Sequence, residues 1–148
     1  MRNLLRGGLV AACLFVASYA FAASDSPVGV WKTIDDVTGK PKSLVEITEH
    51  NGVLQGKVLQ VLQSDQGPHP ICDKCAGERH NKPVEGMTII WDMQNDDGVW
   101  TGGHILDPKN GKTYGCKITL IENGAKLKVR GFIGFALIGR TQVWERQQ

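Results

Sequence analysis

Short runs in which every second residue is apolar recur along the chain from residue 28 onward. Between Lys126 and Arg130, for example, Leu127 and Val129 fall on one face and the basic residues fall on the other. A period of two is typical of a β-strand with one buried face. The pattern predicts about eight strands, at residues 28–35, 43–49, 53–62, 87–94, 99–106, 113–122, 126–132 and 140–146.

Turn signals separate several of these runs. An Asn or Asp followed by Gly is a strong hairpin signal, because Gly accepts the positive φ that tight turns require. Short links predict a meander of antiparallel strands, and closure into a barrel hides the unpaired edges of the sheet. We therefore predict an all-β fold, a small antiparallel up-and-down β-barrel, with a two-sheet sandwich as the alternative. The turn pairs are Asn51-Gly52, Asp97-Gly98, Asn110-Gly111 and Asn123-Gly124.

The N-terminal segment differs in composition from the rest of the chain. Arg2 and Arg6 precede an apolar run at residues 7–21, and residues 20–22 form a small-x-small triplet typical of a signal-peptidase site. The run is shorter than the roughly 20 residues of a membrane-spanning helix. We expect residues 1–22 to be a cleaved signal peptide.

Residues 23–148 are then long enough for a single domain with its own core. Cleavage would leave 15 basic and 15 acidic residues, without the basic excess of nucleic-acid-binding proteins, so nucleic acid is not an expected partner. We expect the product in the periplasm or secreted. A lipoprotein signal ending at Cys13 is the alternative, but it would leave residues 14–21 as an exposed apolar tail.

Residues 63–86 fit no strand and are rich in Pro, Gly and polar side chains. Loops of this length tend to be functional or tethered. In an oxidising compartment, Cys72 and Cys75 favour a disulfide within the loop. Together with His69 and His80 they also form a set of zinc-ligand types, so a zinc site is the alternative; no other cofactor is expected.

The remaining cysteine of the processed chain is Cys116. It alternates with Ile118 and Leu120, so we expect a buried, unreactive thiol that packs as a small apolar side chain. A disulfide with Cys72 or Cys75, which would tie the loop to the barrel, is the alternative.

Residues 132–139 are strongly apolar where a polar turn would be usual. They predict an inward-folded lid, a portal for a lipophilic ligand, or a contact with a membrane or a protein partner. We predict that the barrel binds a small apolar or amphipathic molecule through the end covered by this segment and the loop 63–86. The predicted wall or portal residues are Trp31, Trp91, Trp100, Tyr114, Phe132 and Phe135.

No residue is predicted to be catalytic, because the motifs of serine hydrolases, zinc proteases and phosphate-binding loops do not occur in the sequence. An enzyme is therefore not favoured. Two alternatives to ligand binding stay open: a metal- or redox-linked protein centred on residues 69–80, and an interaction module without a pocket.

The motif Gly29-Val30-Trp31 at the start of the first strand resembles the lipocalin superfamily. In lipocalins a Gly-x-Trp closes the barrel floor and an arginine of the last strand stacks on the indole, a cation–π contact. Arg140 and Arg146 flank the last strand here. The resemblance implies structural roles for Gly29, Trp31 and Arg140.

A second resemblance spans most of the processed chain. It is similar to a bacterial family of exported domains of unknown function with lipocalin-like barrels, which implies a fold and a compartment and no activity. The motifs that carry it are Cys72-Asp73-Lys74-Cys75, residues 100–108 (WTGGHILDP), residues 127–134 (LKVRGFIG) and residues 137–144 (LIGRTQVW).

Overall fold

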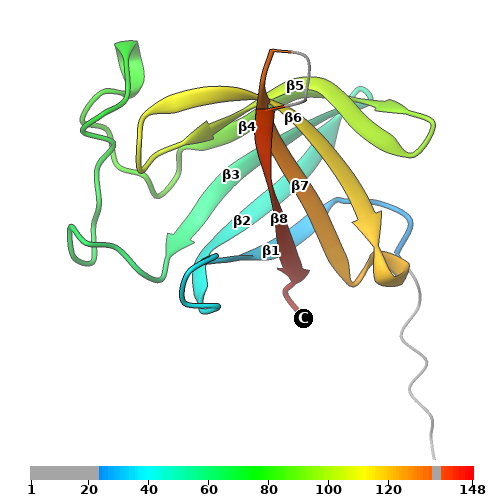
Figure 1. Ribbon diagram of the computed structural model, residues 1–148, viewed down its shortest axis with the longest axis horizontal. Coiled ribbons are helices and arrows are strands. Elements are labelled where there is room, and N and C mark those ends of the chain that lie inside the picture. Colours follow the sequence, from blue (N-terminus) through cyan, green and yellow to red (C-terminus); the bar gives the residue numbers. More distant parts are fainter. Residues whose placement is uncertain (1–23, 135–137) are drawn as a thin grey trace, which may run out of the picture.

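A computed structural model describes residues 24–134 and 138–148. Within them, each strand pairs antiparallel with the next and the last returns to the first, which closes a barrel (Figure 1). The prediction of an all-β antiparallel barrel of about eight strands is thus confirmed, and the sandwich is excluded. The strands are β1 (Gly29–Ile34), β2 (Pro41–His50), β3 (Val53–Val61), β4 (Thr88–Asp96), β5 (Val99–Asp107), β6 (Lys112–Ile121), β7 (Lys126–Ile133) and β8 (Ile138–Arg146).

Tight turns join the strands at one end of the barrel. In the β2–β3 turn Asn51 and Gly52 have φ of 51° and 78°, and in the β4–β5 turn Asp97 and Gly98 have φ of 51° and 87°. Two successive positive φ values characterise the type I′ hairpin turn. The β6–β7 connection contains a short 3-10 turn, η2 (Glu122–Gly124). The chain therefore turns at three of the predicted turn pairs at this end, and the fourth, Asn110-Gly111, lies in the β5–β6 turn at the other end.

Strand β4 departs from simple alternation. Its pairing with β3 shifts register twice, since Lys57 pairs with Thr88, Gly56 with Ile90, and Leu54 with Met93. A bulge places two residues of one strand opposite one of its partner. As a result Ile89, Ile90 and Met93 are all buried, although strict alternation would place Ile90 on the opposite face.

The end of the barrel with the tight turns is filled by its own side chains. Trp31, Ile47, Leu54, Ile118 and Leu127 are fully buried there. Such filling is usual in eight-stranded barrels. The Trp31 Nε1 donates a hydrogen bond of 2.9 Å to the carbonyl of Pro27, so the segment before β1 closes this end.

The four remaining connections lie at the opposite, open end. They include the long connection between β3 and β4, which carries the 3-10 turn η1 (Gly77–Arg79) and stands at the left of Figure 1. No helix in the part of the chain that the structure describes is long and apolar enough to cross a membrane. The predicted signal peptide lies outside the described residues.

Candidate ligand-binding site

A cavity of about 350 Å³ opens at this end of the barrel and extends down to Trp144. Its lining residues come from every strand except β3. Many of these side chains are aliphatic, and Tyr114 adds one aromatic ring. The aliphatic lining residues are Ile34, Ile89, Ile105, Leu106, Val129, Ile133 and Ile138.

Polar groups meet the apolar wall deeper in the cavity. Thr33 of β1 and Ser43 of β2 lie in register, and their hydroxyl oxygens are 2.7 Å apart. On β8 the Oε1 of Gln142 accepts a hydrogen bond of 3.1 Å from the Trp144 indole. The lining therefore combines apolar side chains with hydrogen-bonding groups, which suits an amphipathic molecule.

A second cavity, of about 360 Å³, lies between the barrel mouth and the loop that follows β3. Its lining is more polar and includes Gln63, Ser64, Asp65 and Gln66. It shares five lining residues with the first cavity, so the two meet at the mouth. The shared residues are Lys42, Ser43, Ile89, Asp107 and Pro108.

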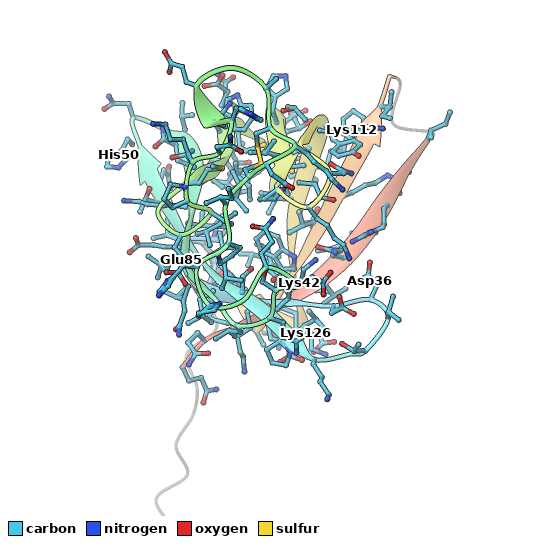
Figure 2. The ribbon with its side chains drawn as sticks, turned by 90° about the vertical axis from the view of Figure 1, so that its left-hand side faces the viewer. Asp36, Lys42, His50, Glu85, Lys112 and Lys126 are labelled. Atoms are coloured by element: carbon cyan, nitrogen blue, oxygen red, sulfur yellow. A yellow bond between two sulfur atoms is a disulfide. The ribbon has the colours of Figure 1, made fainter. Side chains whose placement is uncertain are left out.

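The turn between β1 and β2 is attached to β8 across the rim of the first cavity. Arg140 Nε lies 2.8 Å from Asp36 Oδ2, and the Gln142 amide lies 3.5 Å from the same oxygen. Figure 2, in which the left-hand side of Figure 1 faces the viewer, labels Asp36 and Lys42 at this end of the barrel. The Arg140 charge is therefore paired on the rim.

The loop of residues 62–87 is fixed beside the mouth by its disulfide. Cys72 and Cys75 are bonded to each other and buried. The Cys72 sulfur lies 3.4 Å from the carbonyl oxygen of Pro108, in the β5–β6 turn. A Cβ added to Gly111 of the same turn would overlap the backbone of Lys74. The disulfide segment therefore packs directly on the β5–β6 turn.

This arrangement bears on the alternative zinc site. Both sulfurs are engaged in the disulfide and are not thiolates, and zinc binds thiolate. His80 Nδ1 lies 3.0 Å from the Cys75 carbonyl, and His69 is exposed. Within residues 24–134 and 138–148, no three metal-binding side chains gather as an ion would require.

The tip of the loop makes a second contact, on the side of the barrel. The Arg79 guanidinium lies over the Trp91 ring, 4.6 Å from its centroid. The other partner of Trp91 is His104, whose ring stacks at 5.6 Å and which is exposed. Trp91 therefore lies on the outer surface under the loop and does not line either cavity.

The other predicted wall residues lie in different places. Tyr114 lines the first cavity. Trp31 and Trp100 are buried without lining it. Phe132 packs its ring against Gly115 of β6, and Phe135 lies outside the described residues. Of the five predicted residues that the structure describes, only Tyr114 lines the cavity, together with aliphatic and polar side chains.

Sequence reasoning missed the polar cavity residues Thr33, Ser43 and Gln142, and the rim residue Lys42. A signal was present, because the first three alternate with the buried Trp31, Val45 and Trp144 and so share their inward face. Polar residues on an apolar face near a strand end are typical of a binding site.

The predicted arginine–tryptophan pair is formed by a different arginine. Arg146, and not Arg140, lies over the Trp31 ring, 4.2 Å from its centroid. Its guanidinium donates to the carbonyls of Gly124, Val28 and Ser26 at 2.7–2.9 Å. Arg140 belongs to the opposite end of β8, where it pairs with Asp36, and this corrects the structural role expected for it.

Burial of Cys116 places its thiol inside the barrel, where it is free of any disulfide. Desolvation raises the pKa of this thiol from its ordinary value of 9.0 to about 12. The alternative in which Cys116 pairs with a loop cysteine is excluded, because those two are bonded to each other.

Comparison with known proteins agrees with this architecture. No curated protein matches the chain. Protein HP1028 of Helicobacter pylori, described as a member of the lipocalin family, is similar in structure, with a TM-score of 0.70 and 22% identity over 82% of each chain. That likeness shows the lipocalin-like fold. The family model described as "Uncharacterized protein conserved in bacteria (DUF2147)" matches residues 29–146, and the chain belongs to this family.

Proposed function

We propose that this protein binds a small amphipathic molecule in the cavity at the open end of its barrel. The observation that carries the proposal is the cavity of about 350 Å³, whose lining combines aliphatic side chains with hydrogen-bonding groups. Pockets for small molecules have about this size and this mixture of apolar and polar lining. The lipocalin-like fold supports the proposal, because barrels of this class commonly enclose one small ligand.

In this proposal the ligand enters at the rim of the barrel, beside the hairpin of β7 and β8. Ile133 and Ile138 pair across the hairpin, and they are 61% and 72% exposed. Both also line the cavity, so an apolar path continues from the outside to the interior. An exposed apolar edge next to a ligand cavity favours uptake from a lipid surface. The sequence between the two isoleucines is also apolar, which favours uptake from a lipid surface in the same way.

We further propose that the protein acts in the periplasm or outside the cell, after cleavage of residues 1–22. The Cys72–Cys75 disulfide supports an oxidising compartment. The basic start and apolar run of the N-terminal segment support export. The intact mass of the exported chain tests this: it should correspond to a protein that begins at Ala23, and an unprocessed chain in the cytoplasm would exclude it.

A cavity-filling variant tests ligand binding. Gly131 lines the cavity, and a Cβ there would make ordinary contacts of 3.5–3.6 Å with Ile105 and Tyr114. In Gly131→Val the Cβ therefore fits without overlap, and the side chain adds two further methyl groups to the cavity. The matched control is Lys128→Val, on the exposed face of the same strand. The probe is N-phenyl-1-naphthylamine, which fluoresces in apolar surroundings.

We expect saturable probe binding to the native protein and to Lys128→Val. Binding to Gly131→Val should be at least tenfold weaker, because the added methyl groups occupy the space of the ligand. Circular dichroism establishes that both variants keep the barrel. Lack of probe uptake by the native protein, or equal uptake by all three proteins, would overturn the proposal.

A further inference from the structure

The junction between the two cavities is lined by one lysine and one aspartate, Lys42 and Asp107. Lys42 lines both cavities, and its side chain is half-buried. Its backbone carbonyl accepts hydrogen bonds from the amides of Leu62 and Gln63, at 2.8 and 3.1 Å. The start of the loop therefore fixes Lys42 at the boundary between the apolar interior and the polar outer cavity.

The Lys42 ammonium lacks a close partner. Among residues 24–134 and 138–148 it makes neither a hydrogen bond nor an ion pair within 4.0 Å. The other cation of the rim, Arg140, is paired with Asp36 at 2.8 Å. A half-buried ammonium gains more from a negative partner than an exposed one, because water screens it less.

Four carboxylates line the outer cavity together with Lys42, and two of them, Asp35 and Asp107, are engaged by backbone amides; the other two are Asp65 and Asp73. Asp35 Oδ1 accepts hydrogen bonds from the amides of Thr38 and Val37, at 2.8 and 3.0 Å. Asp107 Oδ1 accepts one of 2.9 Å from the amide of Lys109. The Thr38 amide is the largest cause that lowers the pKa of Asp35, and the charge of Lys42 makes a smaller contribution. Both carboxylates thus stabilise their own turns.

We propose that Lys42 recognises the negatively charged head group of the ligand, so that the ligand is an amphipathic anion with a carboxylate or phosphate head. Its apolar chain lies in the inner cavity against the aliphatic wall. Its head lies at the junction beside Lys42 and faces the polar outer cavity. This inference rests on the proposed function and adds the chemical class of the ligand.

Competition between matched amphiphiles tests the inference. Dodecanoate and dodecanol have the same chain length and differ in head-group charge. Each is titrated, below its micellar concentration, against the protein with bound N-phenyl-1-naphthylamine. For the native protein, dodecanoate should compete about tenfold better than dodecanol, which corresponds to about 1.4 kcal/mol for one charge-assisted hydrogen bond at a partly solvated site.

Variants test whether the preference for dodecanoate over dodecanol depends on the Lys42 side chain. In Lys42→Gln the ratio of the two affinities should fall to about one. Lys42→Arg keeps the charge and should keep most of the preference. The matched control is Lys112→Gln, an exposed lysine of the same barrel end that lines neither cavity and is labelled apart from Lys42 in Figure 2. Its ratio should equal that of the native protein.

Dodecyl phosphate distinguishes the two kinds of anion. A phosphate head that competes better than the carboxylate indicates a phospholipid-derived ligand, and the reverse order indicates a fatty acid; either order supports an anionic ligand. The inference is overturned if dodecanol and dodecanoate compete equally with the native protein, or if Lys42→Gln retains the preference. In both cases the probe still binds. Failure of the probe itself to bind would instead overturn the proposed function.

Discussion

At the scale of single residues, Arg146 determines how the barrel is closed. It lies on the last strand, and its guanidinium covers the Trp31 ring and donates hydrogen bonds to three backbone carbonyls. These carbonyls belong to the segment before β1 and to the β6–β7 turn. One side chain thus connects the first strand, the last strand and a turn.

Substitution of Arg146 should therefore destabilise the barrel. Arg146→Ala removes the cation–π contact and leaves carbonyl groups without donors, at an expected cost of about 2–4 kcal/mol in the free energy of unfolding. Arg140→Ala serves as the control, because it removes an exposed ion pair that contributes at most about 1 kcal/mol. Urea unfolding followed by tryptophan fluorescence measures both. Equal effects of the two substitutions would contradict the account.

The thiol of Cys116 gives a second residue-scale prediction. Burial raises its pKa to about 12, so the folded protein holds the thiol proton more tightly than the unfolded chain does. This contribution to stability is complete below the ordinary thiol pKa of 9.0 and is lost as the pH rises toward 12. At pH 8 no thiol of the folded, unreduced chain without residues 1–22 should react with a thiol reagent, and one thiol, Cys116, should react after unfolding. Two or three reactive thiols would refute the disulfide assignment.

At the scale of elements, the loop of residues 62–87 is the least regular part of the barrel and yet is fixed at two places. Its disulfide segment packs on the β5–β6 turn, and Arg79 covers Trp91 on the outer surface. Backbone hydrogen bonds inside the loop join Cys72 to Lys82 and Val84 to Pro70, at 2.8 and 3.0 Å. The loop therefore forms a stable wall of the outer cavity.

Substitutions at two glycines distinguish the effect of loop packing from the effect of backbone strain in a turn. Gly111 and Gly98 both have positive φ, of 72° and 87°. A Cβ on Gly111 would overlap the Lys74 backbone, whereas a Cβ on Gly98 would meet no atom within 4 Å. Gly98→Ala should cost about 1 kcal/mol for backbone strain alone. Gly111→Ala should cost more and displace the disulfide segment.

Hydrogen exchange and limited proteolysis measure that displacement. Residues 62–87 should lose protection in Gly111→Ala and keep it in Gly98→Ala. If residues 62–87 are equally protected from exchange and proteolysis in the two variants, packing on the β5–β6 turn does not determine the position of the loop.

The elements themselves could be predicted well from sequence, because alternation and the Asn-Gly and Asp-Gly pairs are local signals. The predicted strand at residues 43–49 corresponds to β2 (Pro41–His50), for example. The orientation of Trp91 could not be predicted in the same way. Its orientation depends on the register shifts between β4 and β3, and no local sequence pattern predicts these shifts.

At the scale of the whole molecule, the barrel has a filled half and an open half. Indole rings and aliphatic side chains occupy the half near the tight turns, and the cavity begins above Trp144. Sequence alternation could identify the inward face of each strand. It could not say how far along that face the filled part extends, because this depends on how strands from all around the barrel are staggered. For that reason Trp31 and Trp100 were expected in the cavity wall and lie outside it.

The central claim is that the open half holds an amphipathic molecule. Native mass spectrometry of the protein, purified from an envelope fraction without detergent, tests it most directly. The account predicts a bound mass that is released on unfolding, extracts as an amphiphile and is absent from Gly131→Val purified in the same way. A native protein that carries no bound mass, and takes none up when incubated with a lipid extract of the same envelope, would contradict it.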